Sequence, residues 1–204
     1  MKKISYSLHL GLIGSETSGK EIFIEFLKEK GYEYYESSKD GFHEVLLIFD
    51  QIPIKMKIFS MEDLNALLLN YEEIKKLDMI ILAMSIYEID SIKEINKELF
   101  ENFEKDYSFQ GSSVLAGIDV ESKISSNSQN VRISQSDIIN KAKELNILYT
   151  YEITNKSTDL SELFNKILDD FIYKIRIKTP ELFDQARNYG KELSIKKKSI
   201  RDKL

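Results

Sequence analysis

Short apolar runs alternate with amphipathic helical patterns along most of this chain. Residues 5–14, SYSLHLGLIG, have the composition of a buried strand, and residues 21–32, EIFIEFLKEKGY, follow with an apolar face at helical spacing. The patterns predict strands at 5–14, 42–49, 52–59, 77–86, 112–119 and 148–154, and helices at 21–32, 91–105, 134–146 and 159–177. Because parallel strands need crossover helices, we expect an α/β fold with a mixed, mostly parallel six-stranded sheet and helices on both faces.

Length and composition limit the number of domains and the kinds of site. A chain of 204 residues that is 42% hydrophobic can bury one sizeable core, so we expect one domain at 1–176 and a C-terminal helical basic tail at 177–204. The absence of cysteine excludes disulfides, thiolate metal sites and cysteine lipid anchors. The N-terminal apolar run is broken by Ser7 and His9 and has no cleavage site of small residues, so we expect a cytoplasmic protein.

Charge is distributed unevenly. Residues 187–204 hold seven basic and two acidic side chains, and because the whole chain has a formal net charge of −5, the rest carries −10. An acidic body argues against nucleic-acid binding, which needs basic charge to displace counterions from phosphates. Thr179 and Pro180 have the pattern of a helix start. We interpret the segment that follows as a solvated basic tail, whose contact with a membrane would be at most peripheral and weak.

The segment GSETSGKE connects the first predicted strand to the first predicted helix. Gly14, Gly19 and Lys20 satisfy the spacing G-x-x-x-x-G-K of a phosphate-binding loop. In such a loop the backbone N–H groups converge on phosphate oxygens, the helix N-terminus adds positive potential, and the lysine reaches the terminal phosphates. The candidate phosphate-binding residues are Gly14, Ser15, Glu16, Thr17, Ser18, Gly19, Lys20 and Glu21. The alternative is a glycine-containing strand-to-helix turn followed by a surface lysine.

The residue after the lysine bears on metal binding. A working loop has Ser or Thr there, whose hydroxyl binds Mg²⁺, whereas this chain has Glu21. Glutamate can bind magnesium, but its negative charge would also repel a nearby phosphate. Ser37 or Ser38, within YYESSKDG, could supply a further hydroxyl, and a solvated serine-rich loop is the alternative. Glu21 and Ser38 are therefore the candidate metal ligands.

In element order and local motifs, residues 5–176 resemble the Ras superfamily of small GTPases, Rab-like proteins in particular. SVLAGIDVE stands where the family has its guanine-reading N-K-x-D, and YEITNKSTDLSELFNKIL resembles the E-T-S-A-K loop and the helix after it. The resemblance implies a P-loop NTPase fold of the Ras-like G-domain type that binds GTP or GDP with Mg²⁺. It also implies that Asp119, Thr154, Asn155 and Lys156 contact the nucleotide.

Several positions depart from the family pattern. Ser60 replaces the aspartate that supports magnesium, Asp63 lies near the glycine that senses the γ-phosphate, and Leu64 lies near the glutamine that orients water. The guanine motif becomes Ile118, Asp119, Val120 and Glu121. We therefore assign no catalytic residue. The expectation is a guanine-nucleotide-binding switch remnant with slow or absent GTP hydrolysis that acts through protein contacts. The alternative is an authentic divergent small GTPase with altered metal ligation.

Three tyrosines lie in the region that corresponds to the first switch. Tyr32, Tyr34 and Tyr35 form an aromatic cluster that is either a partner-binding patch or packing under the loop. The partners we expect are protein effectors or complex subunits that bind the switch-region surface.

Overall fold

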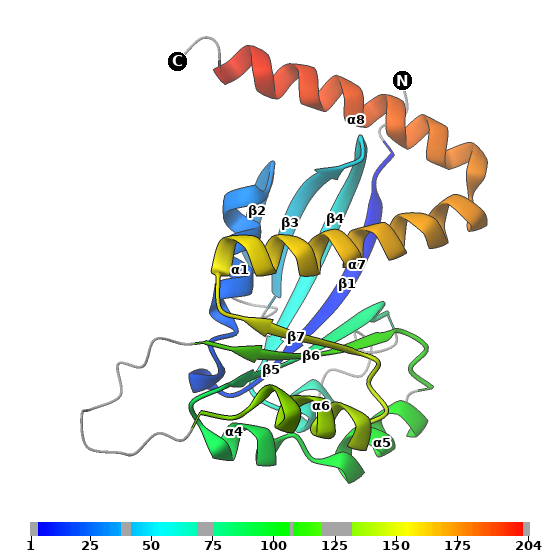
Figure 1. The fold of residues 1–204 in the computed structure, drawn as a ribbon. Coiled ribbons are helices and arrows are strands. Elements are labelled where there is room, and N and C mark those ends of the chain that lie inside the picture. Colours follow the sequence, from blue (N-terminus) through cyan, green and yellow to red (C-terminus); the bar gives the residue numbers. More distant parts are fainter. Residues whose placement is uncertain (1–3, 38–41, 69–75, 107, 120–131, 202–204) are drawn as a thin grey trace.

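A computed structural model describes residues 4–37, 42–68, 76–106, 108–119 and 132–201, which form a seven-stranded sheet with helices on both faces (Figure 1). The strands are β1 (Tyr6–Ile13), β2 (Glu33–Ser37), β3 (Phe42–Phe49), β4 (Ile52–Met61), β5 (Met79–Ser85), β6 (Ser112–Ile118) and β7 (Tyr149–Ile153), in the order β2-β3-β4-β1-β5-β6-β7. Strands β2, β3 and β4 pair antiparallel, and the pairs from β4 to β7 are parallel. The α/β class and the mixed, mostly parallel sheet are confirmed.

The helices lie in two layers. Their bounds are α1 (Glu21–Lys30), α2 (Leu64–Leu68), α4 (Ile89–Glu94), α5 (Lys97–Asp106), α6 (Gln135–Glu144), α7 (Lys156–Lys178) and α8 (Pro180–Arg201), with a short 3₁₀ helix, η1, at Glu16–Ser18. Alternate residues of β5 enter different cores: Ile81 packs with the α1, α7 and α8 side, and Leu82 packs with the α5 and α6 side. This two-residue alternation follows from the pleat of a strand that is buried on both faces.

The sheet has one strand more than the sequence predicts. The segment Glu33–Ser37, interpreted from sequence as part of the first switch region, forms the edge strand β2 and pairs with β3, with Tyr34 opposite Val45. The Tyr34 hydroxyl lies 2.7 Å from Nδ1 of His43 on that neighbouring strand. Tyr34 is thus part of the packing, while Tyr35 stays 60% exposed on the edge strand. Tyrosine favours strands, but so short a segment needs pairing with a neighbour such as β3 to be a stable strand.

The helix predicted at 91–105 is two helices, α4 and α5. Ile95, after α4, has ψ 88°, which is not helical. The Asn96 side chain then accepts a hydrogen bond from the Leu99 N–H at 3.2 Å, as an N-cap of α5 does. The sequence pattern did not predict this break, because the apolar spacing continues through the junction.

Helix α8 packs on the hairpin of β3 and β4. Asp50 and Gln51, the predicted hairpin connection, have φ values of 45° and 65° and form its two-residue turn. Gly190 of α8 lies so close that a Cβ there would be 1.8 Å from the Gln51 carbonyl oxygen, and Arg187 donates to the Asp50 carboxylate at 2.9 Å.

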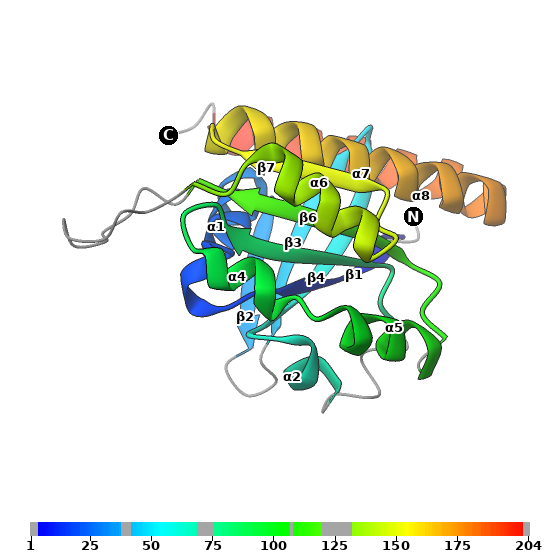
Figure 2. The ribbon, with the colours of Figure 1, turned by 60° about the horizontal axis from the view of Figure 1, so that its bottom comes forward.

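The first part of the predicted basic tail therefore belongs to the folded body. Phe183, Ala186 and Leu193 are buried there, and α7 and α8 run in opposite directions on either side of Thr179 (Figures 1 and 2). The interpretation of this stretch as a solvated tail was wrong, because its apolar face follows the helical period and covers the sheet. Among the described residues, none of the helices combines the length and apolarity needed to cross a membrane.

Candidate phosphate-loop site

The loop predicted to bind phosphate lies where β1 ends and α1 begins. Gly14 donates its N–H to the carbonyl of Met61, the last residue of β4, at 3.1 Å, and a Cβ on Gly14 would be 2.5 Å from the Ala83 carbonyl oxygen of β5. Gly19 has φ 80°, a left-handed conformation that favours glycine. Both glycines of the motif are therefore required by the close strand-to-helix connection itself.

Lys20 is directed back into the loop. Its ammonium donates to the carbonyls of Gly14 at 2.5 Å and Met61 at 2.9 Å, and the residue is only 5% exposed. The alternative interpretation placed Lys20 on the surface, and this part of it was wrong. An ammonium has three N–H donors, so within the described part of the chain one is available to a ligand oxygen. Burial lowers the pKa of Lys20, while the carboxylates of Glu21, Glu62 and Glu16 act in the opposite direction.

Hydroxyl groups of the loop bond mainly to protein atoms. Ser18 donates to the Ser15 carbonyl at 2.7 Å, and Thr17 donates to a Glu88 carboxylate oxygen at 2.5 Å. Glu88 lies just beyond β5, so this bond ties the loop to the next strand of the sheet. These contacts hold η1 in place before any ligand binds.

Glu21 is the first residue of α1 and is exposed. A carboxylate in the first turn of a helix interacts favourably with the positive end of the helix, which gives Glu21 a local structural role. The other predicted metal ligand, Ser38, lies outside the described residues. Within the described part of the chain, no group of three or more His, Cys, Asp or Glu side chains could hold a metal ion.

The residues predicted to contact the nucleotide base meet at the ends of β6 and β7. Asp119 donates its N–H to the Ile153 carbonyl at 2.8 Å, which places it beside the loop that begins with Thr154. The Tyr87 hydroxyl donates to the Asp119 carboxylate at 3.4 Å. The parallel pairing of the strands therefore brings the predicted base-contacting residues together.

Part of this loop serves to start α7. The Asn155 carboxamide oxygen accepts from the N–H groups of Ser157 and Thr158, both at 3.2 Å, which is an N-cap. The N–H groups of Thr154 and Asn155 donate to the Asp159 carboxylate at 2.8 Å. Partial burial raises the pKa of Asp159, but these bonds outweigh it and leave the pKa lowered. Lys156, the first residue of α7, is exposed.

The positions that correspond to the hydrolysis motif have structural roles. Asp63 accepts a hydrogen bond from the Ala66 N–H at 2.7 Å and so caps α2. Leu64 is 4% exposed and belongs to the core on the α5 and α6 side. An apolar, buried side chain cannot orient an attacking water.

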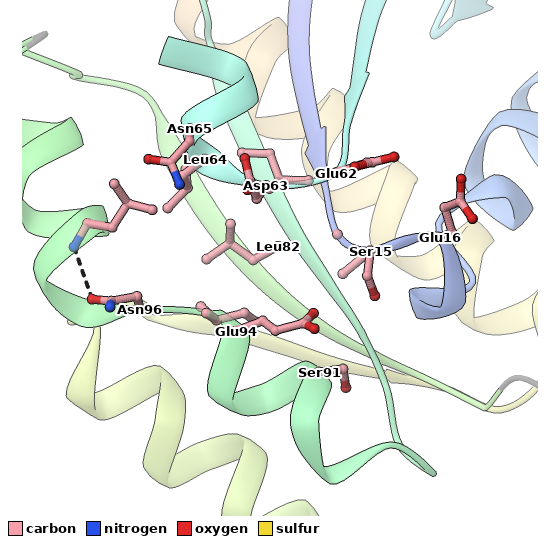
Figure 3. Close-up of a pocket in the computed structure, with 15 residues that line it drawn as sticks. Ser15, Glu16, Glu62, Asp63, Leu64, Asn65, Leu82, Ser91, Glu94 and Asn96 are labelled. Atoms are coloured by element: carbon pink, nitrogen blue, oxygen red, sulfur yellow. Dashed lines mark hydrogen bonds between the residues drawn. The ribbon is translucent and has the colours of Figure 1, made fainter. Parts of the chain in front are cut away.

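A pocket of about 530 Å³ opens beside the loop (Figure 3). It is lined by Ile13, Gly14, Ser15, Glu16, Glu62, Asp63, Leu64, Asn65, Leu82, Ala83, Ser91, Glu94, Ile95, Asn96 and Leu99. Four of these are acids and none is basic, as far as the described residues go. No signal in the sequence indicates that Glu62 and Glu94 line a pocket, because these two acids lie far apart in the chain and share no local motif.

Comparison with known proteins leaves the family open. No protein-family model matches this chain, and no curated protein has significant sequence similarity to it. The α/β fold and the site geometry are therefore the findings on which a functional proposal can rest.

Proposed function

We propose that this chain is a P-loop domain of the small-GTPase type, a guanine-nucleotide-binding switch remnant that acts through protein contacts with slow or absent GTP hydrolysis. The observation that supports it best is the placement of Lys20 between the ends of β1 and β4, where two of its three N–H donors are used by carbonyls of the described residues. Ligands of doubly wound sheets bind at this carboxyl edge of the strands. The loop from Gly14 to Lys20 and the residue Asp119 both lie there.

The negative charges near Lys20 favour weak over tight binding of a nucleotide. The acids Glu16, Glu21 and Glu62 all interact electrostatically with Lys20. A nucleoside triphosphate brings further negative charge to the same place, so each acid opposes its binding. Slow or absent hydrolysis agrees with the cap made by Asp63 and the buried Leu64.

The second candidate, a divergent GTPase that ligates metal through Glu21, is favoured by one observation. Glu21 is exposed at the end of the loop. Mg²⁺ in nucleotide sites is commonly held by one or two carboxylates together with phosphate oxygens and water. The Glu21 carboxylate alone would then be sufficient as the protein ligand of Mg²⁺.

For partners, the proposal is protein effectors or complex subunits that bind the switch-region surface. Tyr35, 60% exposed on the edge strand β2, supports this, because tyrosine is enriched at protein interfaces. A cytoplasmic location, with at most weak membrane contact through the basic C-terminal segment, stays part of the proposal.

Thermal unfolding tests the proposal. The parent protein and Lys20→Ala are melted with and without millimolar GTP, GDP and ATP, and Lys143→Ala, at an exposed position of α6, is the charge-matched control. We expect guanine nucleotides to raise the Tm of the parent and of Lys143→Ala but not of Lys20→Ala, because a ligand of the native state stabilises it. If no nucleotide shifts the parent and the denatured protein releases none, the loop is only a structural turn.

A further inference from the structure

The pocket beside the loop has an apolar floor and a charged rim. The floor is formed by Ile13 and Leu82, which are 4% and 1% exposed and come from β1 and β5. Leu64 from α2 and Leu99 from α5 extend it at the sides. Its volume of about 530 Å³ is within the range of sites that bind small molecules or interface side chains.

The acids of the pocket come from three different parts of the chain. Glu16 belongs to η1, Glu62 and Asp63 follow β4, and Glu94 ends α4. Figure 3 shows Glu94 extending from α4 toward Ser15, Glu62 extending from the end of β4 toward the side where Glu16 lies, and Glu16 on the far side of Ser15. All four acids are exposed.

The charge of the lining decides what chemistry fits. No lysine or arginine is found among the described lining residues. Lys20 of the loop donates to the carbonyls of Gly14 and Met61 and does not line the pocket. The cavity therefore disfavours a phosphate or carboxylate and favours a cation that carries apolar surface.

We propose that this pocket binds a basic side chain of a protein partner, an arginine or lysine whose stem lies on the apolar floor and whose charged head lies among the carboxylates. Such side chains combine an apolar stem, which matches the apolar floor of the pocket, with a positively charged end, which matches its acidic residues. Arginine is also among the residues that contribute most to binding when they fill a pocket at an interface. The inference rests on the protein-binding part of the proposed function and adds the chemistry of the partner.

An NMR titration tests the inference directly. The ¹⁵N-labelled full chain, without nucleotide, is titrated with the capped peptide acetyl-Gly-Arg-Gly-amide and with the same peptide carrying citrulline, which has nearly the same shape but no charge. We expect saturable shifts of the backbone amides of Asn65, Asn96 and Leu99 with the arginine peptide and none with citrulline. The shifts should weaken at 0.5 M salt, because the acids are exposed and screened.

Two variants localise the binding. Glu94→Gln should weaken the arginine peptide about two- to fivefold, the range for one exposed charge pair. Glu98→Gln removes another exposed acid, which does not line the pocket, and should leave the affinity unchanged. Native-like spectra of both variants show that the fold is kept.

Three results would overturn the inference: equal binding of the citrulline peptide, equal loss in the two variants, or no saturable shift at these amides. Because the titration contains no nucleotide, its failure is distinct from failure of the proposed function. If nucleotides raise the Tm while the arginine peptide does not bind, nucleotide binding by the loop is supported and the inference about the pocket is refuted.

Discussion

At the scale of single residues, Lys20 has a structural role in addition to its proposed role in binding a ligand. Its ammonium satisfies two backbone carbonyls at the junction of β1 and β4, and it is 5% exposed. Lys20→Ala removes both donors, and buried acceptors left unpaired cost about 1–3 kcal/mol. We expect the free energy of unfolding without ligand, measured in urea, to fall by that order, against little change in Lys143→Ala. A Lys20→Ala protein as stable as the control would show that the carbonyls do not need the ammonium.

Glu21 distinguishes the two candidate functions. If its charge repels phosphate, Glu21→Ser should raise the affinity for GDP, since two unit charges about 4 Å apart in water interact by about 1 kcal/mol, or roughly fivefold in affinity. If Glu21 ligates Mg²⁺, the same change should leave the affinity equal or lower. Calorimetry with and without magnesium measures the difference, and we expect the rise. Lower affinity only when magnesium is present would favour the divergent GTPase.

At the scale of elements, Asn155 begins α7. Its side chain accepts hydrogen bonds from the N–H groups of Ser157 and Thr158. Asn155→Ala should lower the free energy of unfolding by about 0.5–2 kcal/mol, the usual cost of removing an N-cap. Asn155→Ser keeps an acceptor oxygen and should lose less. Urea unfolding of both variants checks this, and an equal loss in the two would argue that capping is not what Asn155 contributes.

Gly190 determines how closely α8 approaches the β3–β4 hairpin. A Cβ at this position would lie 1.8 Å from the Gln51 carbonyl oxygen, so Gly190→Ala forces the helix away from the turn. Overpacking of this kind costs about 1–3 kcal/mol, although alanine alone would favour a helix. We expect urea unfolding at lower concentration for Gly190→Ala, with Asn188→Ala, an exposed position of the same helix, as control. Stabilisation by Gly190→Ala would mean that α8 does not pack tightly there.

At the scale of the whole molecule, an acidic body surrounds the site where a nucleotide would bind. The pocket acids and the buried Leu64 predict GTP turnover no faster than the slow intrinsic rate of small GTPases, about 10⁻⁴ per second or lower. A single-turnover assay with excess protein measures it, and Lys20→Ala serves as the background control. Turnover well above that rate and absent from the variant would refute the switch-remnant proposal.

Local patterns in the sequence were sufficient for much of the architecture. The continuous apolar runs of β5 and β6, the hairpin at Asp50 and Gln51, and the serine start of α6 depend on residues within a few positions of one another. Ser134, for example, accepts from the Asp137 N–H in a capping box. The glycine spacing of the loop was equally visible, because a tight strand-to-helix connection constrains neighbouring residues.

Only the tertiary structure decided which side chains meet. Thr17 bonds to Glu88, Lys20 reaches the carbonyl of Met61, and Tyr34 joins an edge strand through its pairing with β3. The acids of the pocket and the contact of Gly190 with the hairpin turn also join distant parts of the chain. Apart from the edge strand β2 and the break between α4 and α5, the sequence by itself determined the strands, helices and loop, because these follow from periodicity and local backbone preferences. The partners of the loop and the charge of its pocket depended on the sheet order, which brings together residues that no local pattern connects.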